Sequence, residues 1–337
     1  MKVFVRKIIF FLLILITTNL FFSNSSFAQR FAVASGNWNG PIWATTVGGV
    51  AGSAATPTAA NAVTINPGIS VTMNVAGNCL TLALTNGALS ASVITGTNLL
   101  TIAGNITVTS AGTGIDGAVI SCPLALGAAN RTFTVANDGT SAIDLTISGI
   151  ISGGVNVGFA KAGAGTLFLS GNSTYTGTTT ISAGTIQLGA TGDATNTPLG
   201  TIVGATSITA GAALDLNGFT LGTAEPLTLR GTGIAASGAL LNSSSTSADY
   251  SGVITMGAAG SIIANAGDIN ITGVTDITGN TFRLTLGGTG NGSITRNINN
   301  TTGGLTKSGT GTWTVSGNST YTGTTLITGG LFKLASA

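Results

Sequence analysis

A 28-residue segment occurs twice in this sequence. Residues 161–188 read KAGAGTLFLSGNSTYTGTTTISAGTIQL, and residues 307–334 read KSGTGTWTVSGNSTYTGTTLITGGLFKL. The two segments align without a gap, and 17 of the 28 positions are identical. Most identical positions are Gly, Ser, Asn or Thr, whereas the alternating apolar positions change. Tight corners require particular residues, such as glycine, whereas core positions accept different apolar residues of suitable volume. We therefore interpret the pair as a duplicated structural unit.

Within each unit we expect strands separated by glycine corners. In the first copy, Leu167 and Leu169 are predicted to face inward, Tyr175 to lie in a short second strand, and Ile186 and Leu188 to face inward again. A duplicated catalytic unit would keep reactive groups instead, and this one keeps none.

Alternation of apolar and polar residues continues along the rest of the chain. Short runs such as LTLAL (80–84), TFTVAN (132–137) and FRLTLGG (282–288) suit a pleated, half-buried surface. Gly, Asn, Asp or Ser closes these runs, as tight turns require. No window past residue 28 shows the i, i+3, i+4, i+7 spacing of an amphipathic helix. The sequence therefore predicts an all-β fold.

A sandwich, a barrel and a solenoid all fit many short strands. Three features favour the solenoid. The pattern runs for about 300 residues without a helix or a long polar loop, only 6% of residues are charged, and the sequence repeats internally. Stacked parallel coils pair their backbones about 4.8 Å apart, so such a column needs few charges. We therefore predict a parallel β-solenoid.

The N-terminus has the plan of a secretory signal. A positive start and an apolar run at 8–16 precede a polar segment that ends at Ala28. We predict a signal peptide at 1–28, cleaved before Gln29, and a β-solenoid domain at 29–337. The alternative is a membrane anchor, but a spanning helix needs about 20 predominantly apolar residues.

The chain without its predicted signal is nearly neutral. It keeps 8 of the 11 Lys and Arg residues against 9 Asp and Glu residues, a net charge of −1. A basic surface for nucleic acid is absent, so we expect no nucleic-acid partner. The two cysteines, Cys79 and Cys122, can form a disulfide in a secreted compartment or remain as small buried hydrophobes. The sequence leaves both alternatives open.

The duplicated unit resembles the autotransporter-associated beta strand repeat, also called the passenger-associated transport repeat. The resemblance rests on the Lys, the paired glycines, SGN, TYTG and the late Gly of both copies, and GGLT extends the second copy to 303–334. The segments 35–43 and 59–73 also resemble the first coil of secreted bacterial β-helix proteins. This resemblance implies a right-handed parallel β-helix passenger, exported by the outer-membrane secretion machinery of a Gram-negative-type bacterium. In that family the repeats assist export and folding, and passengers are often adhesins or stalks.

One part of the family pattern is missing from this sequence. Autotransporters end in a membrane β-barrel, whose strands need about 9–11 residues each. Here the sequence stops three residues after the second copy. We expect a chain truncated at its C-terminus, or else another export route.

We predict no catalytic, cofactor-binding or metal-binding residues. There is no histidine, which removes the commonest general base and metal ligand. Among the acidic residues, Asp138 with Asp144 and Asp268 with Asp276 are the pairs nearest in sequence. We interpret all the acids as turn residues at corners, with no enzyme activity and no cofactor. They are Asp116, Asp138, Asp144, Asp193, Asp215, Glu225, Asp249, Asp268 and Asp276.

Three classes of function follow. The leading one is a non-enzymatic passenger, secreted or exposed at the cell surface, that acts as a structural stalk or adhesin. Its expected partners are the secretion machinery and then glycans, host surfaces or abiotic surfaces. The second is a carbohydrate-active β-helix of the lyase or hydrolase kind, which needs two carboxylates about 5–10 Å apart in a groove. The third is an ice-binding or glycan-binding Thr array, which needs a flat ladder two Thr wide over several coils.

Overall fold

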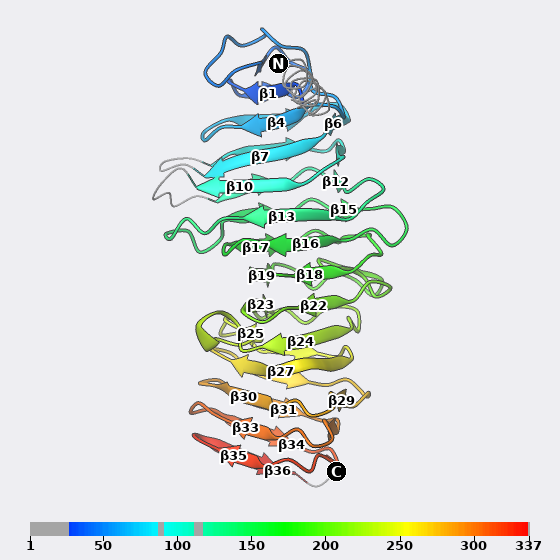
Figure 1. Ribbon diagram of the computed structural model, residues 1–337, viewed down its shortest axis with the longest axis vertical. Helices are drawn as coiled ribbons and strands as arrows, with labels where there is room; N and C mark the ends of the chain where they lie inside the picture. Colours follow the sequence, from blue (N-terminus) through cyan, green and yellow to red (C-terminus); the bar gives the residue numbers. More distant parts are fainter. Residues whose placement is uncertain (1–26, 87–90, 111–116, 336–337) are drawn as a thin grey trace, which may run out of the picture.

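The computed structural model describes residues 27–86, 91–110 and 117–335. These residues form a rod of stacked β-coils, with the N-terminal end at the top of Figure 1 and the C-terminal end at the bottom. Strands in successive coils pair in parallel along the length of the rod. The prediction of an all-β parallel solenoid is confirmed.

Three ladders of parallel strands run along the rod. The first consists of β1 (Gln29–Ala32), β4 (Ala62–Ile65), β7 (Thr81–Asn86), β10 (Ile106–Ser110), β13 (Arg131–Val135), β16 (Phe159–Ala162), β18 (Thr179–Ile181), β22 (Thr206–Ile208), β24 (Leu227–Gly231), the start of β27 (Ile254–Ala264), β29 (Ile277–Thr278) and β32 (Ile298–Asn299).

The second ladder lies on the next face of the rod. It consists of β2 (Gly36–Asn37), β5 (Ser70–Met73), β8 (Val93–Gly96), β11 (Ala118–Ile120), β14 (Leu145–Ile147), β17 (Thr166–Leu169), β19 (Gly184–Leu188), β23 (Ala212–Asp215), β25 (Leu240–Asn242), the end of β27, β30 (Leu284–Gly288), β33 (Leu305–Lys307) and β35 (Thr325–Ile327).

The third ladder has two separate stretches. The first stretch contains β6 (Gly77–Cys79), β9 (Leu100–Ile102), β12 (Leu124–Ala125) and β15 (Ile151–Ser152). The second contains β26 (Ala248–Tyr250), β28 (Ile269–Ile271), β31 (Gly292–Ile294), β34 (Thr312–Val315) and β36 (Leu331–Leu334).

A few elements depart from this plan. β3 (Trp43–Ala44) pairs antiparallel with β1, and β20 (Asn196–Thr197) pairs antiparallel with β21 (Gly200–Thr201). A single turn of 3₁₀ helix, η1 (Ile234–Ala236), interrupts the strands. None of the helices in the described ranges is long and apolar enough to cross a membrane.

Alternation of side chains fills the inside of the rod. Along β7, alternate residues are buried and partly exposed, as they also are along β17 and β34. Successive side chains of a strand point to opposite faces, so one set from each coil meets in the interior. These inward residues form one apolar column from Ala32 to Val315.

The N-terminal end of the column is closed by two tryptophans. Trp38 and Trp43 are fully buried and pack edge to face, with ring centroids 5.1 Å apart. The indole Nε1 of Trp43 donates to the carbonyl oxygen of Trp38 at 2.7 Å. With β3 lying against β1, this segment covers the first coil.

The predicted signal peptide lies outside the described residues except for its last two positions, and β1 begins at Gln29. Cys79 and Cys122 are both buried free thiols, so the structure holds no bridge between them. Burial raises the pKa of each thiol to about 12, which keeps both protonated and unreactive.

Candidate functional site

Each copy of the duplicated segment folds as two coils stacked on each other. In the first repeat (161–188), β16 pairs with β18 and β17 pairs with β19, so that Lys161 lies beside Ile181. In the second repeat (307–334), β33 pairs with β35 and β34 with β36, so that Lys307 lies beside Ile327. Each repeat therefore contains its own coil-to-coil contact.

The lysine of the first repeat braces its two coils. Lys161 points inward and is 0% exposed. Its Nζ donates to the backbone carbonyl oxygens of Ala162 at 3.1 Å, Gly163 at 2.8 Å and Ala183 at 3.1 Å. Two of these acceptors belong to the coil of the lysine, and the third belongs to the next coil. A single ammonium group thus joins two coils through charge-assisted hydrogen bonds.

The second repeat makes the same brace. Lys307 is also 0% exposed. Its Nζ donates to the carbonyl oxygens of Ser308 at 2.6 Å, Gly309 at 3.1 Å and Gly329 at 3.0 Å. These acceptors occupy the positions of Ala162, Gly163 and Ala183, so the geometry is a property of the repeat.

A glycine makes room for each lysine. Gly184 has φ +69°, and a Cβ there would lie 2.6 Å from Nζ of Lys161. Gly330 has φ +65°, and a Cβ there would lie 2.7 Å from Nζ of Lys307. Both the left-handed backbone and the crowding exclude a side chain, which accounts for the late glycine in both copies.

A tyrosine and a threonine form the second shared contact. The hydroxyl groups of Tyr175 and Thr179 lie 2.6 Å apart, and those of Tyr321 and Thr325 lie 2.7 Å apart. The expectation that Tyr175 lies in a strand is wrong, because it sits in the corner between β17 and β18. Hydrogen bonding to Thr179 at the start of β18 fixes that corner.

The surroundings of the two lysines differ in charge. Burial lowers the pKa of Lys161 to about 8, and the carboxyl group of Asp144 partly offsets this shift. Asp144 accepts from the backbone N–H of Thr166 at 2.7 Å. In the second repeat a neutral side chain has this role, since Thr312 donates its N–H to Asn291 at 3.0 Å.

The two repeats do not occupy the same faces of the rod. β17 and β19 of the first repeat lie in the second ladder, and that ladder continues directly to β33 and β35 of the second repeat. In the first repeat the lysine strand is therefore on the first ladder, whereas in the second it is on the second ladder. The unit is rotated by one face, which shows that its contacts do not depend on a particular face.

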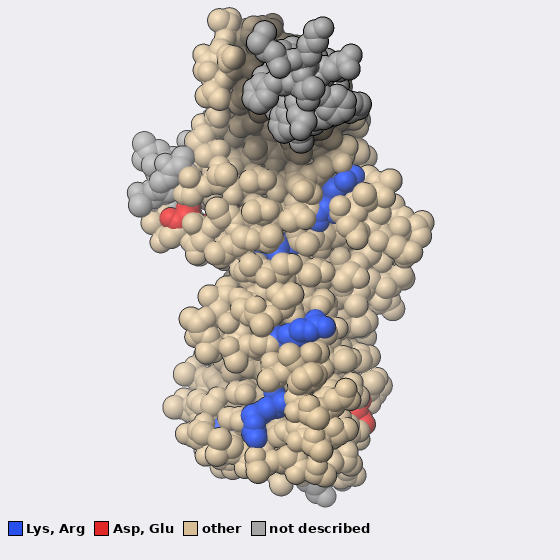
Figure 2. Space-filling view, viewed as in Figure 1, with Lys and Arg blue, Asp and Glu red and all other residues tan. Residues whose placement is uncertain are grey.

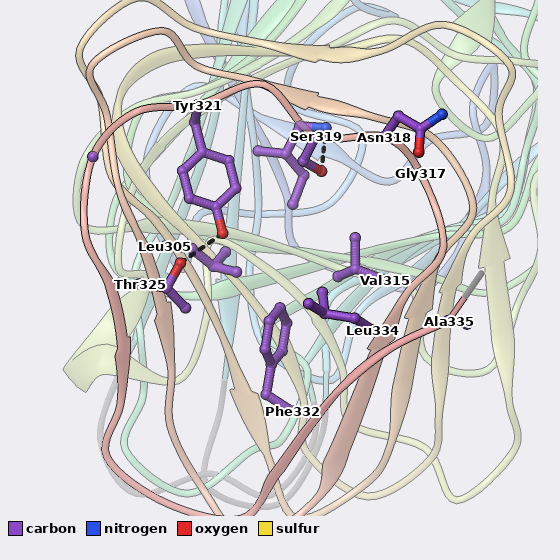
Figure 3. A pocket seen from close by; sticks show the side chains of 12 residues that line it. Leu305, Val315, Gly317, Asn318, Ser319, Tyr321, Thr325, Phe332, Leu334 and Ala335 are labelled. Carbon is purple, nitrogen blue, oxygen red and sulfur yellow. Dashed lines mark hydrogen bonds between the residues drawn. The ribbon is translucent and has the colours of Figure 1, made fainter. Parts of the chain in front are cut away.

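An open cavity of about 530 Å³ lies at the end of the second repeat. Figure 3 shows Phe332 and Leu334 directed into it, beside the hydrogen-bonded pair of Tyr321 and Thr325. At the first repeat, the next coil covers the equivalent side chains. Ile208 pairs beside Ile181, and Leu214 pairs beside Ile186, with all four side chains buried.

The acidic residues that the structure describes mainly accept hydrogen bonds from nearby backbone and side-chain groups. Asp144 accepts from the backbone N–H of Asp138 at 2.9 Å, but Asp144 is 1% exposed and Asp138 caps its own turn. Asp268 and Asp276 accept hydrogen bonds in separate places, from Asn291 and Asn299. The cavity at the end of the rod has no acidic residue in its lining. Asp116 lies outside the described residues.

A threonine-rich column follows the outer side of the first ladder. Thr180, Ser207, Thr228, Thr255 and Thr278 occupy successive register positions. Two positions further along the same strands the outward residues are mixed, and include Arg230 and Gly257. The column is therefore one residue wide here, short of the ladder two Thr wide that an ice-binding array needs. The face seen in Figure 2 is largely uncharged, with scattered basic residues.

The buried lysines are the residues that the sequence reasoning missed. A signal for them existed: Lys161 follows Phe159 at a spacing of two, and Lys307 follows Leu305 in the same way. Each lysine is thus in the inward phase of its strand, where an apolar residue is expected. A lysine at such a position in both copies indicates a buried cation with fixed acceptors.

Comparison with known proteins agrees with this geometry. The model of the passenger-associated transport repeat family matches residues 159–188 and 305–333. These ranges coincide with the two braced coil pairs. The chain therefore carries two passenger-associated transport repeats on a β-solenoid.

One relative of known type is an autotransporter. The chain is 33% identical over 209 residues to the adhesin BmaC autotransporter of Brucella suis biovar 1 (strain 1330). The match covers 59% of this chain but only 5% of the adhesin, so the chain spans a small fraction of its relative's length. No solved structure matches the chain.

Proposed function

We propose that this chain is part of a non-enzymatic β-solenoid passenger of a Gram-negative-type bacterium, displayed at the cell surface or secreted, where it acts as a stalk or an adhesin. In this proposal the two repeats assist export across the outer membrane and folding outside the cell. The observation that carries it is the lysine brace, which both repeats build with the same geometry although they lie on different faces.

The brace suits a chain that folds as it emerges from a secretion pore. Lys161 pairs in register with Ile181, and Leu167 pairs with Ile186, so the contacts inside a repeat span only 19 or 20 residues. Contacts between residues near in sequence form quickly, because little chain entropy is lost in closing the loop. A repeat can therefore close its two coils as soon as they emerge, and each later coil then has a template.

The proposed surface role draws on two further features. The described residues form a continuous rod with few charges, which fits a stalk (Figure 2). The relative is named an adhesin. The proposed partners are the outer-membrane secretion machinery during export, and afterwards glycans, host surfaces or abiotic surfaces.

The test replaces both braces with an apolar side chain of similar length. The variant Lys161→Met, Lys307→Met leaves six carbonyl oxygens without an ammonium donor, at a cost of about 1–3 kcal/mol per brace. The matched control is Lys333→Met, because Lys333 is exposed. Protease-resistant protein at the surface of producing cells is measured for all three proteins.

We expect the double variant to reduce folded surface protein several-fold while the control matches the wild type. Equal surface amounts for all three proteins would contradict the role of the repeats in export and folding. The adhesive role has its own test, in which cells that make the protein are compared with a deletion strain for attachment to glycan-coated and plastic surfaces. If the producing cells and the deletion strain attach equally well to each surface, the adhesive role is contradicted and the stalk role is supported.

A further inference from the structure

Glu225 is a carboxyl group in the interior of the rod, and none of the described residues forms an ion pair with it. It precedes β24 and is 1% exposed. Its Oε1 accepts from the hydroxyl group of Thr206 at 2.8 Å. Its Oε2 is buried and has no hydrogen-bond partner in the described part of the chain. An ionised carboxylate in this place would lose its hydration without compensation.

Two buried tyrosines lie in this part of the interior. The hydroxyl group of Tyr250, in the following coil, donates to the backbone oxygen of Glu225 at 2.6 Å. Tyr175 lies two coils earlier, in the first repeat. Burial raises the pKa of both tyrosines, and Glu225 adds a smaller contribution in the same direction. Arg296 is buried beyond Tyr250, but it donates to the backbone oxygens of Gly252 and Tyr250. None of these contacts gives Glu225 an ion pair.

The protonation of Glu225 therefore differs between the folded and unfolded chain. Burial raises the pKa of Glu225 from 4.5 to about 8, although the hydrogen bond from Thr206 opposes the shift. Between these pH values the folded chain holds a proton that the unfolded chain has lost. A raised folded pKa contributes stability that is complete below the unfolded pKa and is lost as the pH rises through the folded pKa.

We propose that folding of the coils around β22, β24 and β26 takes up a proton at Glu225, and that losing this proton at alkaline pH loosens those coils. Ionisation creates a buried charge whose second oxygen has no donor, so the coils must separate enough to admit water. Glu225 lies two coils after Tyr175 and Thr179 of the first repeat. Thr206 lies between them, because it pairs with Thr179 on one side and donates to Glu225 on the other. Proton uptake thus accompanies the coils that form directly after the braced unit.

The test compares the full chain with Glu225→Gln, which keeps the shape and cannot ionise. In the wild type, uptake of one proton makes the unfolding constant rise about tenfold per pH unit between roughly pH 5.5 and 7.5. In Glu225→Gln this slope is expected to fall by one proton, and the variant should be the more stable protein at pH 8.5. The matched control is Asp193→Asn. Hydrogen bonds from Thr195 lower the pKa of this exposed acid to about 2, so it is ionised in the folded and the unfolded chain throughout this pH range, and its replacement should leave the slope unchanged.

An unchanged slope in Glu225→Gln would overturn the proposal. So would a variant that is less stable than the wild type at pH 8.5, because that result indicates an ionised and stabilising Glu225. If the variant does not fold, infrared spectroscopy of the wild type decides the matter. The proposal requires a protonated carboxyl group at pH 7 that is lost with a midpoint near pH 8, and the absence of that signal contradicts it.

Discussion

The two repeats have the same internal contacts, but a further coil packs on the first repeat and none of the described coils packs on the end of the second. Both form the three-carbonyl lysine brace and the tyrosine–threonine hydrogen bond between equivalent atoms, at 2.6–3.1 Å. Ile181 and Leu188 of the first repeat are 0% exposed, whereas Ile327 and Leu334 of the second are 54% and 79% exposed. The comparison separates what a repeat does by itself from what the next coil adds. The repeat fixes its own corners, and apolar burial comes from the following coil.

The largest expected difference between the repeats concerns this apolar cover. Ile181→Ala removes a side chain that is surrounded on both sides, so we expect a loss of about 4 kcal/mol. Ile327→Ala at the equivalent position should cost less than about 1 kcal/mol, because half of that side chain is already in solvent. Urea unfolding of both variants gives the two values. Equal losses of unfolding free energy would contradict this difference, because they would mean that Ile327 is as buried in solution as Ile181.

The glycine beside the lysine should matter in both repeats. Gly184→Ala forces a Cβ into a left-handed residue and to within 2.3 Å of the carbonyl oxygen of Gly165, so we expect a loss of about 3 kcal/mol. Gly330→Ala has the same conflict with Gly311 at 2.5 Å, but the uncovered coil can shift, and about 1–2 kcal/mol is expected. The measurement is chemical denaturation, with Gly139→Ala as the control for a left-handed glycine in open space. A cost no greater than that of the control would refute the crowding argument.

The tyrosine hydroxyl groups provide a smaller contrast. Tyr175→Phe leaves the buried hydroxyl of Thr179 with only the long contact to the carbonyl oxygen of Leu199 at 3.5 Å, and we expect a loss of about 1 kcal/mol. For Tyr321→Phe, water can replace the lost hydroxyl at the exposed Thr325, so the loss should be below about 0.5 kcal/mol. Thermal melting of the two variants ranks them. The reverse order would contradict the effect of cover.

The last contrast is a dependence of stability on pH that comes from the lysines. The pKa of Lys161 is about 8 in the folded chain and 10.5 ordinarily, so between these values the unfolded chain binds more protons. The contribution of Lys161 to stability therefore rises with pH across this window and is lost as the pH falls through 8. The difference in unfolding free energy between wild type and Lys161→Met, measured from pH 8 to 10, should grow with pH. Lys307→Met should show the same sign, because burial also lowers the pKa of Lys307. A flat difference would show that the ammonium group is not buried.

Much of this architecture follows from the sequence. Alternation at residues such as Leu167 and Leu169 determines the inward face of a strand, and repeated glycines determine the corners. The position of the two repeats around the rod could not be predicted, because it depends on the summed lengths of all the intervening coils. The position of Tyr175 outside a strand was missed for a related reason: TYT alternates like a strand, and the sequence does not reveal the hydrogen bond to Thr179.

The buried ionisable groups are the other feature that the sequence hides. Glu225 and Arg296 have no counterparts in the repeats that would indicate burial, and a count of charges does not separate them from surface residues. Their positions depend on which coil lies on each side. Lys161 and Lys307 differ in this respect, because their duplication and their inward phase make them recognisable from the sequence.

Parallel stacking of coils in one fixed register is the central claim, and distances between spin labels test it most directly. Three variants are made in a Cys79→Ala, Cys122→Ala background. Each has one spin-labelled cysteine in place of Thr180 and a second in place of Thr228, Thr255 or Thr278. The register predicts separations of two, three and four coils, or about 10, 14 and 19 Å between backbones. A distance that grows by about 4.8 Å per coil supports the solenoid. Distances that do not increase in this order would contradict it.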